Sequence, residues 1–233
     1  RARRIGAALQ ALASAGERAV LLYPPGAEYL VGFFGCLYSG LVAVPAYPPD
    51  PARLERTLPR LRAIIDDSQA TVVLTTSFIA SMVEVLFESA PDLKSLRWVA
   101  TDTLEAGLES TWRRPAVTAD SVAFLQYTSG STGSPKGVVL SHSNLLHNLE
   151  LIKGAFGTRD DSVGVIWLPP YHDMGLIGGI LVPLYQGFHT ALMSPLDFLK
   201  RPRLWLETLT RLGGTISGGP NFAFELCVRR IPP

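Results

Sequence analysis

Residues 19–44 read AVLLYPPGAEYLVGFFGCLYSGLVAV, and this stretch decides the fold class. The short apolar run at 19–22 predicts a buried strand, the stretch at 28–38 predicts a helix, and the run at 41–44 predicts a second strand. Strands that are apolar along their whole length are typical of a parallel sheet, because helices cover both of its faces. The sequence therefore predicts an α/β fold.

The same alternation continues to the end of the chain. Further helices are expected at 53–67, 78–87, 176–185, 202–212 and 221–230, and another is expected to follow Ser141 as its N-cap. Further strands are expected at 71–74, 96–99, 121–127, 137–140, 163–168, 189–193 and 215–217. The irregular stretch 103–119 contains Pro115 and is interpreted as a connection. We therefore expect a first α/β unit over residues 1–119 and a second over residues 120–233.

The composition of the 233 residues is that of a globular protein, with 47% hydrophobic and 18% charged residues. The formal net charge is +1, which supports no overall attraction to nucleic acid. Cys36 and Cys227 lie in apolar stretches, so we expect free, buried thiols and a reducing, cytoplasmic compartment. The sequence has no Cys/His spacing typical of a metal site, and no metal ligand is predicted.

Two stretches without acidic or basic charges, 29–49 and 174–196, are long enough to cross a membrane. Glycines and prolines interrupt both, so a buried helix followed by a buried strand is the favoured interpretation, and no membrane span is expected. The chain begins at Arg1 rather than Met, has no signal-type segment and ends abruptly after a helical pattern. We interpret both ends as cuts within a longer protein.

The most informative stretch is 128–137, TSGSTGSPKG, which lies between two predicted strands. Glycines let backbone N–H groups approach an anion closely, hydroxyls add donors, and Lys136 adds a positive charge. These groups suit a polyphosphate. The stretch is not a Walker A loop, because Pro135 stands at the required Gly and Gly137 at the required Ser or Thr. On composition alone, a flexible polar hairpin is the alternative.

This ordered string resembles the phosphate loop of the adenylate-forming superfamily, which comprises acyl-CoA synthetases, luciferases and the adenylation domains of peptide synthetases. The resemblance implies flavodoxin-like parallel sheets flanked by helices, as part of a large N-terminal adenylation domain whose C-terminal lid is absent from these residues. It also implies ATP and Mg²⁺, with the Mg²⁺ ligands further along the chain. The implied ATP-binding residues are Thr128, Ser129, Gly130, Ser131, Thr132, Gly133 and Lys136, of which Lys136 is also the implied catalytic residue.

A second stretch, 167–179, reads WLPPYHDMGLIGG and follows a predicted strand. The chain reverses there at the carboxyl edge of the sheet, where open α/β sheets bind ligands. The stretch is similar to the corresponding motif of fatty acyl-AMP ligases, and so are residues 44–50, 194–202 and 217–227. By this resemblance, the expected substrate-binding residues are His172, Asp173, Met174, Gly175, Ile177, Asn221 and Phe222, with His172 also catalytic.

Several of these residues also have a structural interpretation. His172 either lies at the junction of acyl carboxylate and nucleotide or caps the end of a strand. Asp173 either orients His172 or caps the following helix at its positive end. Met174, Ile177 and Phe222 either line an acyl tunnel or pack in the core, which is the commoner role for such side chains.

By the same resemblance, the predicted reaction is ATP-dependent activation of a medium- or long-chain fatty acid to an acyl-adenylate, followed by transfer to the phosphopantetheine thiol of an acyl carrier protein. That carrier is either separate or fused within a polyketide or peptide synthase. An acyl-CoA ligase, with coenzyme A as acceptor, and a non-catalytic nucleotide-binding fragment are the alternatives. We expect the 233 residues alone to be inactive.

Overall fold

The computed structural model describes residues 1–49, 53–128 and 135–232, and it confirms the α/β class. The chain folds into two compact units, Arg1–Asn144 and Leu145–Pro233. This boundary differs from the expected division after residue 119, because two strands beyond that residue complete the sheet of the first unit.

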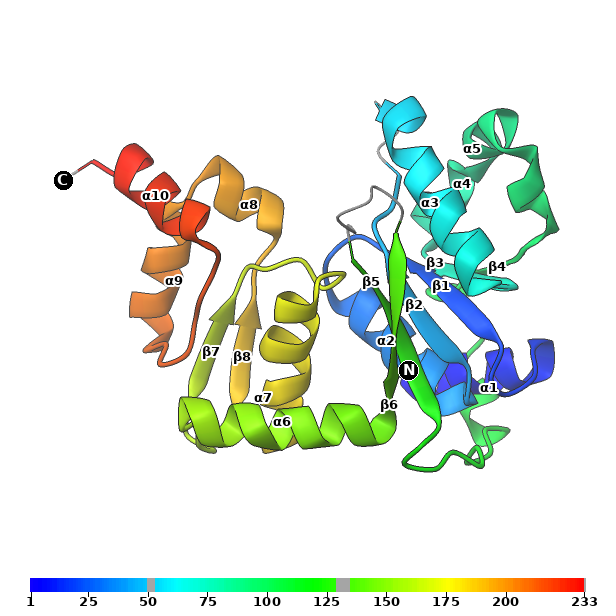
Figure 1. Cartoon of the computed structure of the whole chain (residues 1–233), viewed down its shortest axis with the longest axis horizontal. Coiled ribbons are helices and arrows are strands. Elements are labelled where there is room, and N and C mark those ends of the chain that lie inside the picture. Colours follow the sequence, from blue (N-terminus) through cyan, green and yellow to red (C-terminus); the bar gives the residue numbers. More distant parts are fainter. Residues whose placement is uncertain (50–52, 129–134, 233) are drawn as a thin grey trace. The chain divides into compact units, whose positions relative to one another are not determined.

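A six-stranded sheet forms the centre of the first unit, with the strand order β4-β3-β1-β2-β5-β6 (Figure 1). The strands are β1 (Arg18–Leu22), β2 (Val42–Ala46), β3 (Val72–Thr75), β4 (Arg97–Ala100), β5 (Val122–Thr128) and β6 (Lys136–Ser141). The first five run parallel to their neighbours, whereas β6 is antiparallel to β5. Thr128, at the end of β5, therefore lies at the edge where the other parallel strands also end.

Helices cover both faces of this sheet. They are α1 (Ala2–Leu12), α2 (Ala27–Ser39), α3 (Leu54–Ser68), α4 (Ser77–Ser81) and α5 (Val83–Ser89), with 3₁₀ turns at Pro91–Ser95 and Leu108–Ser110. On one face, Leu58 of α3 packs in a buried core with Val20 and Val44. On the other face, Phe33 of α2 lies edge-on to Phe124 of β5, with ring centroids 5.8 Å apart. Side chains that alternate along each strand thus supply both cores.

The structure adds a helix, α1, that the sequence pattern does not predict. Ile5 and Leu9 of α1 are buried, and the helix packs along α2. Gly35 of α2 allows this close approach, since a Cβ there would lie 2.5 Å from the Ile5 side chain. The connection at 103–119 is tied to the same pair of helices by Trp112, whose Nε1–H donates to the carbonyl oxygen of Tyr38 at 2.7 Å.

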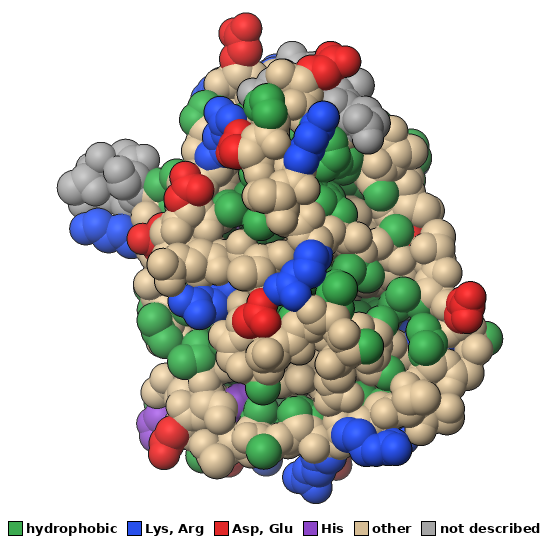
Figure 2. Space-filling view, turned by 90° about the vertical axis from the view of Figure 1, so that its right-hand side faces the viewer, with side chains coloured by type: hydrophobic (Ala, Val, Ile, Leu, Met, Phe, Trp, Pro, Cys, Tyr) green, Lys and Arg blue, Asp and Glu red, His purple; other side chains and the backbone are tan. Residues whose placement is uncertain are grey.

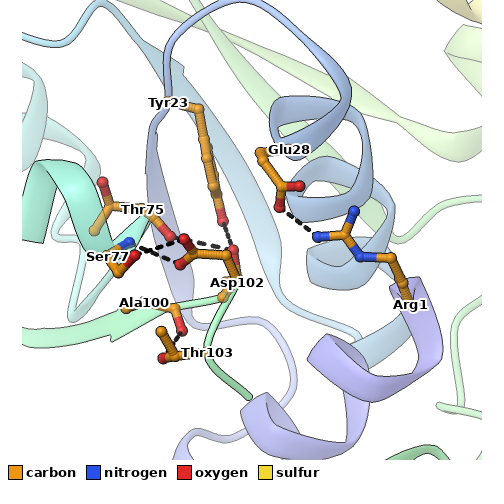
Figure 3. A network of polar contacts seen from close by, with 9 residues as sticks. Arg1, Tyr23, Glu28, Thr75, Ser77, Ala100, Asp102 and Thr103 are labelled. Carbon is orange, nitrogen blue, oxygen red and sulfur yellow. Dashed lines mark hydrogen bonds and ion pairs between the residues drawn. The ribbon is translucent and has the colours of Figure 1, made fainter. Parts of the chain in front are cut away.

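Polar side chains link the carboxyl ends of β1, β3 and β4 (Figure 3). Tyr23, just after β1, donates its buried O–H to Thr101 Oγ1 at 2.8 Å, and Thr101 in turn donates to the carbonyl oxygen of Thr75 at 3.1 Å. Asp102 accepts hydrogen bonds from the N–H and the hydroxyl of Ser77, both at 2.7 Å. Such linked bonds reinforce one another and hold the strand ends in place.

The second unit contains two parallel strands, β7 (Val163–Ile166) and β8 (His189–Leu192). The expected strand at 215–217 is reduced to a single bridge between Ile216 and Gly164. The helices are α6 (His142–Phe156), which begins in the first unit, the π-helix η4 (Met174–Leu181), α7 (Val182–Gln186), α8 (Pro195–Lys200), α9 (Arg203–Leu212) and α10 (Asn221–Arg230). The rings of Trp167 and Phe198 stack 3.9 Å apart in the core of this unit.

The start of α6 is fixed by the residue that the sequence predicts. Ser141 Oγ accepts a hydrogen bond from the N–H of Asn144 at 3.1 Å, and Asn144 Oδ1 accepts one from the N–H of Ser141 at 3.0 Å. This reciprocal pair satisfies backbone donors that the first turn of a helix leaves free. The predicted N-cap is therefore confirmed.

The surface mixes both signs of charge. On the face shown in Figure 2, basic and acidic side chains lie interspersed, so neither sign forms a continuous field there. Within the described ranges, no helix combines the length and the apolar composition needed to cross a membrane.

Candidate functional site

The described part of the predicted phosphate loop is its base. Thr128 ends β5 and Lys136 begins β6, and these two exposed residues face each other across the antiparallel pair. The predicted loop residues Ser129, Gly130, Ser131, Thr132 and Gly133 lie outside the described residues. The flanking strands confirm the strand–loop–strand arrangement that distinguishes this loop from a Walker A loop.

A tight turn follows β7 and carries the second group of predicted residues. The N–H of His172 donates to the carbonyl oxygen of Pro169 at 3.2 Å. A Cβ at Gly175 would lie 2.1 Å from that same oxygen, so any side chain there would collide with the backbone. Gly175 therefore makes room for the turn itself.

His172 and Asp173 contact each other on this turn. His172 Nδ1 lies 2.6 Å from Asp173 Oδ1, and the same oxygen accepts the N–H of Met174 at 2.6 Å. Asp173 thus contacts His172 and caps the π-helix at once, which unites the two interpretations of its role. The N–H of Met174 also lies 3.4 Å from His172 Nδ1, so the exposed imidazole is held at the start of the π-helix.

A cavity of about 380 Å³ lies beside the turn, within the second unit. Its wall is largely apolar and comes from α6, the end of β7, the π-helix and residues 216–218. Representative side chains in the wall are Ile152, Leu168, Ile177 and Val182. Both the volume and the apolar lining are typical of sites for small molecules.

The predicted substrate-binding residues divide into two groups around this cavity. Asp173, Met174 and Ile177 lie in its wall. His172, Gly175, Asn221 and Phe222 lie outside the described lining, although His172 contacts the wall residue Asp173. Phe222 instead lies edge-on to Trp167, with 6.1 Å between the ring centroids, at the start of α10.

Helix α6 contributes to the cavity wall, which the sequence did not predict. Asn148, Ile152 and Phe156 line it from one face of the helix, on which they are spaced four residues apart. Ile152 and Phe156 continue the apolar stripe that begins with Leu145 and Leu149. The first two residues of the stripe are buried, but Phe156 is 68% exposed. An apolar stripe that continues along the helix beyond its buried residues is the sequence signal that would have indicated the site.

Two adjacent glycines of the π-helix have different surroundings. A Cβ at Gly179 would lie 2.6 Å from Ile166 Cγ2, so this glycine allows the helix to approach β7. A Cβ at Gly178 would meet no atom within 4 Å, although the residue lines the cavity. Gly178 therefore leaves part of the cavity open. Irregular π-helical turns of this kind are frequent at functional sites.

The described residues offer groups for an anion. The exposed Lys136 side chain and the Thr128 hydroxyl at the loop base suit phosphate oxygens. In the part of the chain that the structure describes, no cluster of three or more His, Cys, Asp or Glu side chains is placed to hold a metal ion. The described donors at the loop base therefore suit the phosphate tail of a nucleotide.

Comparison with known proteins identifies the family. The model of the AMP-binding enzyme family matches residues 1–232. The chain belongs to the AMP-binding enzymes. This match confirms the resemblance to adenylate-forming proteins, and the similarity to solved structures described below confirms the fold class.

Three proteins to which the chain is similar are ligases that act on fatty acids. The medium-chain-fatty-acid–acyl-carrier-protein ligase JamA of Moorena producens is 48% identical over 231 residues, which cover 99% of this chain and 39% of JamA. The long-chain-fatty-acid–AMP ligase FadD32 of Mycobacterium marinum is 39% identical, over all of this chain and 37% of its own length. The fatty acyl-adenylate ligase of L. pneumophila, solved with acyl adenylate and pyrophosphate, has a TM-score of 0.89 and 42% identity, over 99% of this chain and 39% of that one. This AMP-binding chain therefore spans about two fifths of the length of its relatives.

Proposed function

We propose that this chain provides the acyl-binding and ATP-phosphate-binding parts of a fatty acyl-AMP ligase. The supporting observation is the apolar cavity of about 380 Å³ beside the His172–Asp173 pair. A largely apolar pocket with a few polar side chains, such as Asn148 and Ser217, in its wall suits a molecule with an alkyl chain and a polar head group. The relatives JamA and FadD32 are ligases of fatty acids, which points to the same class of substrate.

The proposed first step joins the fatty acid to the nucleotide. A carboxylate oxygen attacks the α-phosphorus of ATP, an acyl–phosphate bond forms, and the bond to the leaving pyrophosphate breaks. Because both reactants are anions, binding must offset their repulsion and fix their geometry. Mg²⁺, when bound, would neutralise phosphate charge in this step.

The residues of this chain have separate roles in that step. The cavity wall, including Met174 and Ile177, holds the alkyl chain away from water. Asp173 holds the His172 ring through Nδ1, and the imidazole would lie beside the acyl carboxylate and close that end of the pocket. Lys136 would pair with the β- and γ-phosphates from the base of the loop.

The proposed second step transfers the acyl group to a thiol. The sulfur of a phosphopantetheine arm forms a thioester with the acyl carbon, and AMP leaves. The similarity to JamA, an acyl-carrier-protein ligase, supports an acyl carrier protein as the acceptor, separate or fused within a synthase. A coenzyme A ligase remains the second candidate, and supplying coenzyme A or a carrier protein to the whole protein would distinguish the two acceptors.

Exchange of Lys136→Ala tests the proposal in the whole protein. We expect ATP–pyrophosphate exchange in the presence of decanoate to fall roughly 150-fold, since one well-placed donor is worth about 3 kcal/mol in such a transition state. The matched control is Lys153→Ala, which removes another exposed lysine, in the last turn of α6. Equal exchange rates for the two variants, with both as stable as the wild type, would contradict the role of Lys136.

A further inference from the structure

The side chain of Tyr127 lies at the base of the hairpin formed by β5 and β6, which we call the phosphate-loop hairpin. Tyr127 is buried, whereas Thr128, the next residue, is exposed. Tyr127 pairs with Gly137 across the two strands. A Cβ at Gly137 would come within 2.9 Å of the Tyr127 ring and 3.0 Å of its hydroxyl oxygen. The ring therefore lies across β6 at Gly137, next to Lys136, and a glycine is needed there.

The hydroxyl group of Tyr127 connects this hairpin to helix α3. It donates a hydrogen bond to Asp67 Oδ2 at 2.5 Å, a short distance typical of an O–H bonded to a carboxylate. Burial and the bond to Asp67 raise the pKa of Tyr127, so the phenol remains protonated and acts as the donor. Asp67 lies in the last turn of α3.

The end of α3 is itself attached to the sheet. Arg18, the first residue of β1, donates from Nε to the carbonyl oxygen of Ser68 at 2.8 Å and from Nη2 to Gln69 Oε1 at 3.2 Å. Asp67 directly precedes these two residues. The carboxylate that receives the Tyr127 hydrogen bond is therefore fixed relative to the centre of the sheet.

Tyr127 of β5 packs in the buried core with α3 side chains, whereas strand β6 is poorly covered. A cavity of about 350 Å³ adjoins the Tyr127–Asp67 pair and also borders Gly137 and Val139. Val138 and Val139 of β6 are 46% and 59% exposed, so few apolar contacts hold this edge strand. Because β6 pairs with β5 at one edge of the sheet, a shift at Tyr127 would move both ends of the loop.

We propose that Tyr127 and Asp67 are positioning residues, whose hydrogen bond sets where Thr128 and Lys136 are presented to the phosphate tail of a nucleotide. This inference rests on the proposed function and deepens it, because it assigns the control of the phosphate site to two residues outside the loop. Neither residue needs to touch the nucleotide. The hydrogen bond acts by restricting the hairpin to one geometry.

Kinetics in the whole protein form the first half of the test. Tyr127→Phe removes only the hydroxyl group, and we expect it to lower kcat/KM for ATP about tenfold or more, as for the loss of a hydrogen bond to a charged group. The KM for fatty acid should not change. Asp67→Ala should cause the same loss of kcat/KM for ATP. Asp67→Asn should keep most of the activity, because its amide oxygen still accepts the hydrogen bond. The double variant Tyr127→Phe with Asp67→Ala should be no less active than either single variant.

The matched control is Tyr185→Phe. Tyr185 in α7 also donates to a carboxylate, that of Glu150, at 2.9 Å, but this pair is exposed and lies in the second unit. We expect its removal to leave all kinetic parameters unchanged. An equal effect of Tyr127→Phe and Tyr185→Phe on kcat/KM for ATP would overturn the proposal.

Hydrogen exchange of the 233-residue chain forms the second half and needs no activity. In Tyr127→Phe, amides of residues 122–128 and 136–141 should exchange faster, whereas those of β1 and β3 should not. Unchanged exchange in the hairpin, or a loss shared equally by ATP and fatty acid kinetics, would overturn the positioning role. If the whole wild-type protein showed no ATP-dependent activity, the proposed function would be refuted instead. The hydrogen-exchange data would still show whether the Tyr127–Asp67 hydrogen bond restrains the hairpin.

Discussion

Gly178 is a position at which the proposed acyl cavity can be shortened without disturbing the fold. It lines the cavity, its φ angle is ordinary, and an added Cβ would meet no atom within 4 Å. In Gly178→Phe, the new ring would therefore occupy cavity space rather than collide with the protein. We expect this variant to bind short fatty acids as the wild type does and to bind long ones weakly.

The magnitude follows from the hydrocarbon that the ring displaces. Each buried methylene contributes about 0.8 kcal/mol, and a phenyl ring would displace about four methylenes. The affinity for a long chain should therefore fall by about 3 kcal/mol, or roughly 200-fold. A chain short enough to end before the ring should lose nothing.

Displacement of a fluorescent fatty acid, measured with acids of increasing chain length, provides the assay. Gly178→Ala is the control for the site, since one methyl group displaces little hydrocarbon. Gly179→Ala is the control for packing, because its Cβ would lie 2.6 Å from Ile166 and should destabilise the fold by about 1–3 kcal/mol without selecting for chain length. If Gly178→Phe weakened all lengths equally, or none, the cavity would not be the acyl site.

Two further predictions concern stability. Ser141 Oγ accepts the N–H of Asn144 and so caps α6. Ser141→Ala removes this cap and should lower the free energy of unfolding by about 1 kcal/mol, measured by urea titration. An unchanged urea midpoint would refute the capping role. Hydrogen bonds from Thr71, foremost, and from Ser14 and Arg97 lower the pKa of Glu17 from 4.5 to about 2. Because this folded-state pKa lies below the unfolded one, Glu17 stabilises the fold above pH 4.5, and this stabilisation is lost as the pH falls towards 2. The difference in free energy of unfolding between wild type and Glu17→Gln should therefore narrow from pH 6 to pH 3. A constant difference would contradict this prediction.

Local patterns in the sequence were sufficient for the fold class. Apolar runs such as 19–22 and 41–44 predict strands because a strand buried on both faces needs apolar side chains throughout, and the structure places β1 and β2 there. The ordered string at 128–137 predicted the family, and the family match confirms that prediction. These conclusions depend on neighbours in the chain, which a sequence displays directly.

Contacts between distant residues were decided only by the tertiary structure. Nothing near Tyr127 in the chain indicates Asp67, 60 residues earlier, as its partner. Equally, the pattern of the π-helix cannot show that Gly179 faces Ile166 while Gly178 faces open space, since both are glycines in one apolar run. The sequence by itself determined which elements form and which residue types the loops carry. Only the packing of those elements decided which side chains meet and where a cavity is left, because such contacts depend on distances that no local pattern encodes.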